Sequence, residues 1–203
     1  MPDVDYRSSC ALFTDCLRII RTWSRAHPDH VPILILLNLK EGGLGIPGAV
    51  ETLPFDAAAM DAVDREIRSV FRERELITPD RVQGRHATLR EAVLAGAWPT
   101  LRNARGRVMF ALDAPRSQVD LYRGARRSLE GRVMFVNIDE DSPAAGYITL
   151  NDPSVDRERI RRDVAAGFMV RTRADADTVQ ARSNDTAMRE AALGSGAQYV
   201  STD

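Results

Sequence analysis

Short, continuously apolar runs alternate along this chain with segments of helical periodicity, and this alternation constrains the fold more than any other feature. The longest run, Pro32–Lys40, is too uniformly apolar for a strand with one solvated face. It predicts a strand buried on both sides, which is typical of parallel sheets. Similar strands are expected at 107–113, 132–138 and 146–151, at Phe168 and at Gln198. Helical patterns separate them, at 14–26, 56–74, 88–95, 117–127, 154–165 and 185–193. Thr14 and Asp56 are expected to cap the first two helices.

About six strands alternating with helices predict a parallel sheet wrapped by helices. A complete (β/α)8 barrel usually needs about 250 residues, whereas this chain has 203. We therefore expect one α/β domain over residues 1–203, an incomplete TIM-type barrel that lacks its first two strands. An unfinished barrel has open edges, so we expect the isolated chain to be poorly soluble.

Composition excludes several classes of protein. The formal net charge of -1 makes nucleic acid an unexpected partner. The chain contains no run of about 18 apolar residues, so no transmembrane segment is predicted. Met1–Asp5 lacks the pattern of a signal peptide. The two cysteines, Cys10 and Cys16, would form a disulfide in an exported parent protein or stay as thiols in the cytosol. We favour the disulfide and export, and the location itself stays open.

Polar side chains follow several of the predicted strands, at the ends where α/β barrels build their active sites. Lys40, the sole lysine of the chain, closes the first strand. It could hold a phosphate as a point charge, or it could lie in a solvated turn with Glu41. Asp113 and Asp203 each close another strand. Either could bind hydroxyls of a polyol, and the alternative for each is a helix cap or turn residue.

Arg171 and Arg173 lie two residues apart, so they point the same way in a strand. Adjacent guanidinium groups repel each other unless an anion or a carboxylate lies between them. The group between them could be the phosphate of a ligand, or it could be the carboxylate of Asp175 in a salt bridge.

The histidines do not add a catalytic group. His27 and His30 precede the first predicted strand, at the end opposite the expected site, and His86 lies in a polar stretch. We interpret all three as structural or solvated, which leaves no general acid or base for proton transfer to oxygen. The long segment 41–54, with its glycines and prolines, is expected to be a functional loop.

Segments along nearly the whole chain, in the same order, resemble the calcium-dependent phosphoinositide phospholipase C family of bacteria and fungi. The segments are Ser9-Cys10, Asp15-Cys16-Leu17, Trp23-Ser24, His27-Pro28, His30-Val31-Pro32-Ile33, Trp98-Pro99-Thr100-Leu101, Arg105-Gly106-Arg107, Val170-Arg171-Thr172-Arg173-Ala174-Asp175, Ser195-Gly196-Ala197-Gln198 and Ser201-Thr202-Asp203.

The resemblance implies a phosphatidylinositol-specific phospholipase barrel in which two histidines act as general acid and base. The inositol 2-hydroxyl attacks phosphorus, diacylglycerol leaves, and a cyclic inositol phosphate forms. Calcium, held by carboxylate and amide oxygens, assists this reaction. The resemblance places the catalytic histidines before residue 1. It also places Asn38, as a metal ligand without charge, where the family tends to carry glutamate two residues before the lysine.

The leading hypothesis is therefore a phosphoric diester hydrolase of lipid metabolism that acts on phosphatidylinositol, at a membrane surface. This chain supplies the substrate-binding residues Lys40, Arg171, Arg173 and Asp203, and we expect it to be inactive alone. Two alternatives stay open: a glycerophosphodiester phosphodiesterase of the same superfamily, and a non-catalytic remnant of a barrel.

Overall fold

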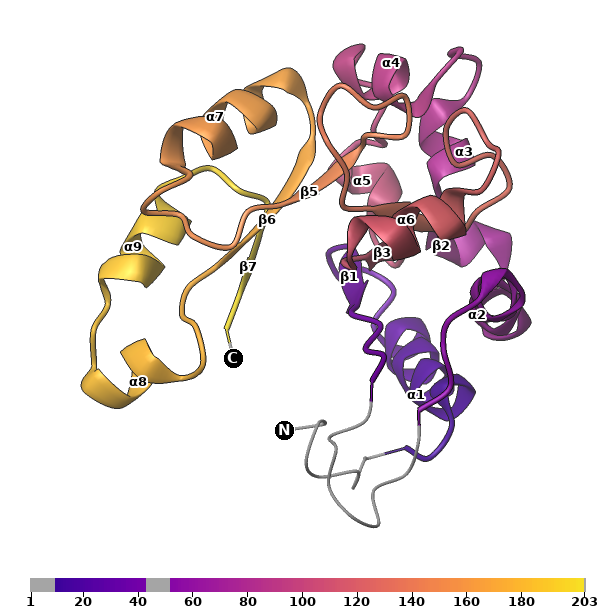
Figure 1. The fold of residues 1–203 in the computed structure, drawn as a ribbon, viewed down its shortest axis with the longest axis horizontal. Coiled ribbons are helices and arrows are strands. Elements are labelled where there is room, and N and C mark those ends of the chain that lie inside the picture. The colour runs from indigo at the N-terminus through magenta and orange to yellow at the C-terminus, as the bar shows by residue number, and fades with distance from the viewer. Residues whose placement is uncertain (1–9, 43–51, 203) are drawn as a thin grey trace. The chain divides into compact units, whose positions relative to one another are not determined.

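The structure, a computed structural model, describes residues 10–42 and 52–202 (Figure 1). Asp203 and most of the predicted loop 41–54 lie outside the described residues. The chain forms two compact units, each with parallel strands and helices. Unit 1 comprises Met1–Thr78, Thr100–Ala125 and Arg132–Met134, and unit 2 comprises Pro79–Pro99, Arg126–Gly131 and Phe135–Asp203.

Unit 1 is built around a buried central strand. Its elements are α1 (Phe13–Ala26), β1 (Ile33–Leu37), α2 (Ala57–Val70), η1 (Glu73–Glu75), β2 (Leu76–Ile77), α5 (Leu101–Ala104), β3 (Val108–Leu112) and α6 (Arg116–Arg123). β3 lies between β1 and β2, and both pairings are parallel. All five residues of β3 are buried, as expected for an apolar strand with neighbours on both edges.

The first strand forms where it was predicted, but the prediction that it is buried on both sides is wrong. Every residue of β1 is only half-buried. Within the described part of the chain β1 pairs with β3 alone, so its other edge carries no neighbouring strand. Burial of a strand depends on such neighbours, which the apolar character of the segment does not specify.

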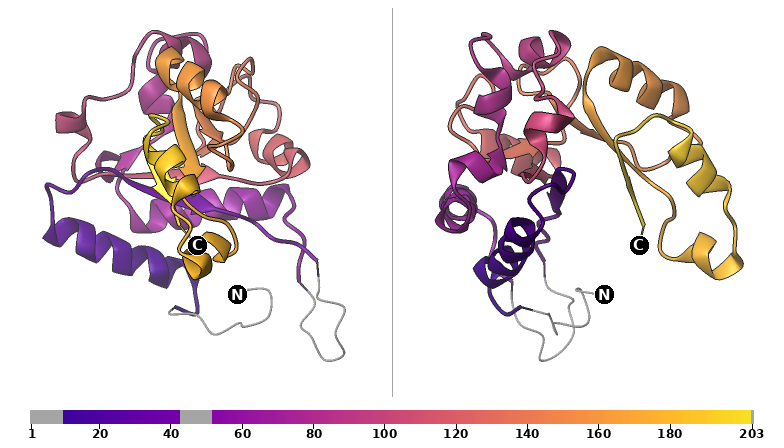
Figure 2. Two further views of the ribbon diagram at one scale, coloured as in Figure 1. Left: turned by 90° about the vertical axis from the view of Figure 1, so that its left-hand side faces the viewer. Right: turned by 180° about the vertical axis from the view of Figure 1, so that it is seen from behind.

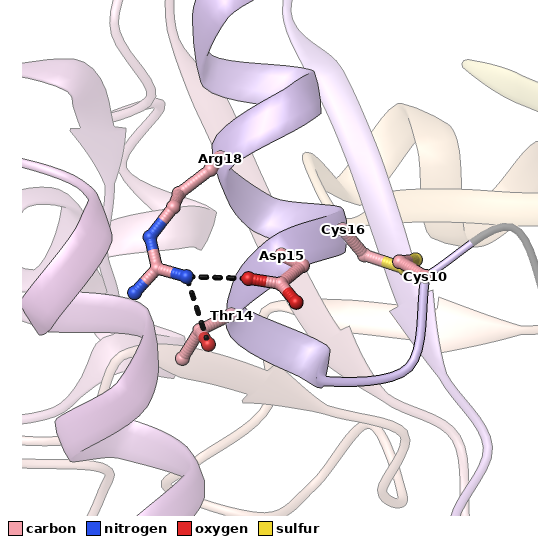
Figure 3. Close-up of a disulfide and its surroundings, with 5 residues drawn as sticks. All are labelled: Cys10, Thr14, Asp15, Cys16 and Arg18. Carbon is pink, nitrogen blue, oxygen red and sulfur yellow. Dashed lines mark hydrogen bonds and ion pairs between the residues drawn. A yellow bond between two sulfur atoms is a disulfide. The ribbon is translucent and has the colours of Figure 1, made fainter.

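The start of α1 also differs from the prediction. Its N-cap is Leu12, which makes no capping side-chain bond, and Thr14 lies inside the helix. The Thr14 hydroxyl instead accepts a hydrogen bond of 3.4 Å from the Arg18 guanidinium (Figure 3). A disulfide joins Cys10 to Cys16, with 5.5 Å between their Cα atoms, and so closes the segment that leads into the helix. The disulfide was the favoured of the two alternatives.

The second helix begins as predicted and ends earlier. Asp56 Oδ1 accepts a hydrogen bond of 2.8 Å from the amide of Ala59, which confirms the predicted cap. The last helical residue is Val70, because Phe71 adopts an extended conformation. There the Phe71 ring packs edge-on against Phe110 of β3, with 5.7 Å between centroids. The buried Phe71 ring therefore marks the point where the helix ends, a few residues before the predicted end.

Unit 2 contains a second parallel sheet. Its elements are α3 (Pro79–Gln83), α4 (Leu89–Leu94), most of β4 (Met134–Val136), β5 (Tyr147–Thr149), α7 (Arg157–Ala166), β6 (Met169–Arg173), α8 (Val179–Ser183), α9 (Ala187–Leu193) and β7 (Tyr199–Ser201). β6 lies between β5 and β7. α7 and α9 both contact β6, and Figure 2 shows them along the same side of the three strands. The sequence pattern missed β2, α3, α5 and α8, each of five residues or fewer.

The parallel α/β architecture is confirmed. Closure into one barrel over residues 1–203 and the number of missing strands stay predictions. None of the helices in the described ranges is long and apolar enough to cross a membrane.

Candidate functional site

One face of the sheet in unit 2 is lined with polar side chains. Register pairs Thr149 of β5, Arg171 of β6 and Tyr199 of β7, and the next row pairs Arg173 with Ser201. Residues paired in this way point to the same side of a parallel sheet, and side chains alternate along each strand. These five residues therefore share one side, which we call the polar face. The intervening residues Ile148, Val170 and Thr172 point to the other side and are fully or almost fully buried.

Arg171 is held rigidly on the polar face. Its side chain is buried, with the residue only 8% exposed. One terminal nitrogen donates a hydrogen bond of 2.7 Å to Asn151 Oδ1, beyond the end of β5, and the other donates to the Ser201 hydroxyl on β7. These two bonds orient the guanidinium group on the polar face. A buried, oriented cation of this kind suits a phosphate or a carboxylate ligand.

Arg173 lies two residues further along β6, at the carboxyl end of the strand, and is half-buried. Its Nε atom is buried and has no hydrogen-bond partner among the described residues. The two arginines are therefore on the same face, as their spacing predicts. Two cationic side chains, one with a donor still available, make this strand end a candidate anion site.

The hydroxyl groups beside the arginines are also ordered. Thr149 Oγ1 donates to the Tyr147 hydroxyl at 3.0 Å, and the Thr149 amide donates to Asn137 Oδ1 at 2.9 Å. Burial raises the pKa of Tyr199, so its hydroxyl stays protonated at neutral pH. The face can therefore offer both hydroxyl and guanidinium donors to a polar ligand.

Unit 1 brings a second group of polar residues to its own strand ends. Asn38 and Lys40 follow β1, and Asp113 follows β3. Leu37 pairs with Leu112, and the Asp113 amide donates to the Leu37 carbonyl at 2.9 Å. Asn38 and Asp113 thus come directly after paired residues of neighbouring strands. An amide oxygen and a carboxylate at adjacent strand ends are ligand types that calcium prefers.

The pairing of Asn38 with Asp113 was missed by the sequence analysis, which considered Asp113 only as a polyol ligand or a cap. The available signal was that each residue directly follows an apolar strand of a parallel sheet.

No group of three or more histidine, cysteine, aspartate or glutamate side chains suited to a metal occurs within residues 10–42 and 52–202.

The predicted substrate-binding residues are thus divided between the units. Lys40 belongs to unit 1, and Arg171 and Arg173 belong to unit 2. Asp203 lies outside the described residues. The structure brings the two arginines together, and convergence of all four side chains stays a prediction.

The histidines of unit 1 make local contacts at the amino end of β1. His30 Nε2 lies 2.7 Å from Ser24 Oγ, and its Nδ1 lies 2.6 Å from the Val31 carbonyl. The His27 ring stacks on Trp23 at 4.3 Å between centroids. These contacts agree with the interpretation of both histidines as structural.

Comparison with known proteins identifies one matching protein family. The sequence model of the family described as phosphoinositide phospholipase C, Ca²⁺-dependent, matches residues 1–203. No curated protein sequence matches this chain.

Similar solved structures come from two bacterial sources. A calcium-dependent phosphoinositol-specific phospholipase C from Pseudomonas sp., in the apo form with myoinositol, has a TM-score of 0.62 at 18% identity, covering 94% of this chain and 64% of that chain. The same Pseudomonas protein in its apo form, crystal form 1, gives a TM-score of 0.62 at 19% identity, covering 94% of this chain and 64% of that one. A phosphatidylinositol-specific phospholipase C from Streptomyces antibioticus shares 24% identity over 86% of this chain and 56% of its own, with a TM-score of 0.48. The Pseudomonas likeness shows a common fold, and the chain spans 64% of the length of that protein.

Proposed function

Because the chain belongs to the Ca²⁺-dependent phosphoinositide phospholipase C family, we propose that it forms the substrate-binding part of a phosphodiesterase that cleaves phosphatidylinositol. The observation that carries this proposal is the pair of arginines at the end of β6. Arg171 is oriented by Asn151 and Ser201, and Arg173 has a buried Nε donor without a partner among the described residues. Together they offer a phosphate diester charge-assisted hydrogen bonds from one rigid strand.

In the proposed reaction the inositol 2-hydroxyl attacks the phosphorus atom. The bond from phosphorus to the diacylglycerol oxygen breaks, and a cyclic inositol phosphate forms. A general base accepts the hydroxyl proton, and a general acid protonates the departing oxygen. The arginines of β6 stabilise the charge on the phosphoryl oxygens as it redistributes in the transition state. Proteins of this family act on a lipid, so the proposed substrate is presented at a membrane surface.

The acid and base themselves are proposed to lie outside this chain. His27 and His30 are engaged at the amino end of β1, away from the strand ends that carry Asn38 and Lys40. We therefore propose that the 203-residue chain binds the inositol phosphate headgroup but does not turn over substrate. An inositol headgroup is favoured over glycerol because the matching family is one of phosphoinositide enzymes.

The donor chemistry at the strand ends of unit 1 fits calcium, the ion on which this family depends. Asn38 and Asp113 would hold it through one amide oxygen and one carboxylate, and water oxygens would complete its shell. When bound, calcium lowers the pKa of a coordinated hydroxyl and offsets phosphoryl charge. With a neutral amide in place of a second carboxylate, the affinity of this site for calcium is expected to be low.

The test is binding of myo-inositol 1-phosphate to the full chain, measured by titration calorimetry. Arg173→Gln removes one cation and keeps a polar side chain, so we expect affinity to fall about tenfold, the loss typical of a charge-assisted hydrogen bond. Arg102→Gln, an exposed arginine of α5, is the matched control. Equal affinity for the wild-type chain and Arg173→Gln would contradict the proposed role of the polar face.

A further inference from the structure

The loop that joins β4 to β5, residues 137–146, is fastened to two helices of unit 2. On one side Arg90 of α4 donates from Nε to the Glu140 carbonyl at 2.6 Å and from its amide to the Pro143 carbonyl at 3.1 Å. On the other side the Glu140 carboxylate accepts a bond of 2.6 Å from Arg159 Nε of α7. The side chain of Glu140 therefore links the loop to α7.

A second, more deeply buried carboxylate lies beside this link. Asp163 follows Arg159 by one turn of α7, and its side chain is only 3% exposed. Asp163 Oδ1 accepts a hydrogen bond of 3.3 Å from Arg162 Nε, whereas Oδ2 is buried and has no hydrogen-bond partner among the described residues. The more buried of the two carboxylates thus has the weaker pairing.

Both carboxylates share the same two arginines. Arg159 gives its short bond to Glu140 and lies 3.8 Å from Asp163. Arg162 lies 3.3 Å from Asp163 and 3.7 Å from Glu140, but its side chain is 66% exposed, so water screens its charge. Burial and the neighbouring Glu140 raise the pKa of Asp163 to about 6. The bond from Arg159 lowers the pKa of Glu140 to about 2, so Asp163 is the member that titrates near neutral pH.

The other elements around the pair add little positive charge. Arg90 of α4 is directed at loop carbonyls rather than at either carboxylate. Phe168, next to β6, donates its amide to the Asp163 carbonyl and carries no charge. Asp139 and Asp141, both exposed, flank Glu140 in the loop, and Asp156 directly precedes α7. These aspartates add negative charge and so oppose the ionisation of Asp163.

We propose that Glu140 and Asp163 form a pH-sensitive latch, which holds loop 137–146 against α7 while Asp163 carries its proton and releases the loop when Asp163 ionises. A protonated Asp163 can donate to Glu140, which then keeps its bond to Arg159. An ionised Asp163 repels Glu140 and competes with it for both arginines. The latch goes beyond the proposed function, because it uses none of the groups assigned to substrate.

The loop connects this latch to the polar face. Asn137, its first residue, accepts a hydrogen bond of 2.9 Å from the amide of Thr149, which lies on that face. Asn137 also forms an isolated parallel bridge with Tyr147 of β5. Release of the loop would therefore loosen the β5 edge of the polar face, and acidity would make that edge more ordered.

The test is hydrogen–deuterium exchange of the full chain without ligand, at about pH 5 and about pH 7.5, corrected for the pH dependence of the chemical exchange step. The reporters are the amides of Ser142 and Ala145, which donate to carbonyls within the loop. A carboxyl group with a pKa of 3.8 in the open loop and about 6 in the closed loop makes opening about tenfold more favourable across this interval. We therefore expect protection of both amides to fall about tenfold.

Two variants of the pair separate the latch from a merely structural role. Asp163→Asn cannot ionise and keeps a donor for Glu140, so loop protection should be equal at both pH values. Glu140→Gln removes the neighbouring charge, so protection should be lower than in the wild-type chain and again independent of pH. Glu158→Gln changes an exposed carboxylate of the same helix, 85% exposed, and should keep the full pH dependence.

Three results would overturn the latch: wild-type protection that is the same at both pH values, an unchanged pH dependence in Asp163→Asn, or an equal loss of protection in β3 of unit 1. The third result would mean that the whole chain, rather than the loop, responds to pH. Because the exchange measurement uses no ligand, its outcome is independent of the titrations with myo-inositol 1-phosphate. Failure of the latch and failure of the proposed function are therefore distinguishable.

Discussion

At the scale of single residues, charged and polar side chains determine how unit 1 is held together. Arg132 is 5% exposed and donates to Asp61 at 2.6 Å and to Asp64 at 3.1 Å. Its guanidinium carbon lies 4.4 Å from the centroid of the Tyr122 ring. The Tyr122 hydroxyl donates to Asp64 at 2.6 Å and accepts from the Met134 amide at 2.9 Å. This network joins α2, α6 and the start of β4, and removing one member would leave its buried neighbours short of a hydrogen bond.

Tyr122→Phe is predicted to destabilise the chain by about 1–3 kcal/mol, because it leaves the buried Met134 amide and the Asp64 carboxylate each short of a partner. Unfolding by urea, followed by circular dichroism, measures this. Asp120→Asn, on the exposed side of the same helix, is the control and should change stability by only a few tenths of a kcal/mol. If the two variants unfold at the same urea concentration, the network does not stabilise the fold.

A carboxylate pair in unit 2 predicts a dependence of stability on pH. Burial, together with the neighbouring Glu140, raises the pKa of Asp163 to about 6. The hydrogen bond from Arg159, 2.6 Å long, lowers the pKa of Glu140 to about 2. Because the folded pKa of Asp163 is raised, its stabilising contribution is complete below the unfolded value of 3.8 and is lost as pH rises through about 6. Glu140 acts in the opposite sense, and its contribution is lost as pH falls from 4.5 towards 2.

Asp163→Asn, which cannot ionise, should therefore gain stability relative to the wild-type chain as pH rises from about 4 to about 7. Urea unfolding of both proteins at several pH values across this interval gives the difference directly. Arg162 and Arg159 lie 3.3 and 3.8 Å from Asp163, and they favour the ionised form. Stability curves that run parallel across the interval would show that these arginines already cancel the effect of burial.

At the scale of elements, most strands and long helices could be predicted because each carries its own periodicity. The segment around Arg107, for example, became β3 within one residue of each predicted end. Burial of β1 could not be predicted in this way, because it depends on which strand lies on either side. In α1, only some of the apolar residues lie on the face that packs against the rest of the protein. Leu17 is 1% exposed, whereas Ile19 is 60% and Trp23 is 48% exposed. A sequence shows how apolar a helix is, but its neighbours determine which apolar residues become buried.

The exposed side chains of α1 predict self-association of the isolated chain. Ile19 and Trp23 lie one helical turn apart, so they present a joint apolar surface to water. The double substitution Ile19→Lys with Trp23→Lys should lower the apparent mass in sedimentation at high concentration. Leu17→Ala, on the packed face, is the contrasting variant and should lose about 2–5 kcal/mol of stability. Unchanged self-association in the double variant would exclude this surface as the cause.

At the scale of the whole molecule, the parallel topology decides which predicted site residues meet. Parallel strands end at one edge of their sheet, so residues that follow different strands become neighbours although they are far apart in sequence. Arg171 and Arg173 did not need this rule, because they lie on one strand and the alternation of side chains places them on the same face. The pairing of Asn38 with Asp113 needed the knowledge that β1 and β3 are adjacent, which depends on a contact across 75 positions of the chain. Strand order is the step that local sequence patterns do not supply.

The proposed calcium site of unit 1 lies at the ends of the neighbouring strands β1 and β3, and it can be tested by measuring calcium affinity. Asn38→Glu would place a second carboxylate beside Asp113 at the end of the neighbouring strand. Calcium affinity rises with the number of charged ligands, so this variant should bind calcium about tenfold more tightly than the wild-type chain. The same added charge on the exposed Asn103 of α5, as Asn103→Asp, controls for general electrostatic attraction. Calorimetric titration with calcium chloride measures all three, and Asp113→Asn in the Asn38→Glu background should abolish the gain. If Asn103→Asp gains as much as Asn38→Glu, the ends of β1 and β3 do not form a calcium site, and the metal of this family is held elsewhere.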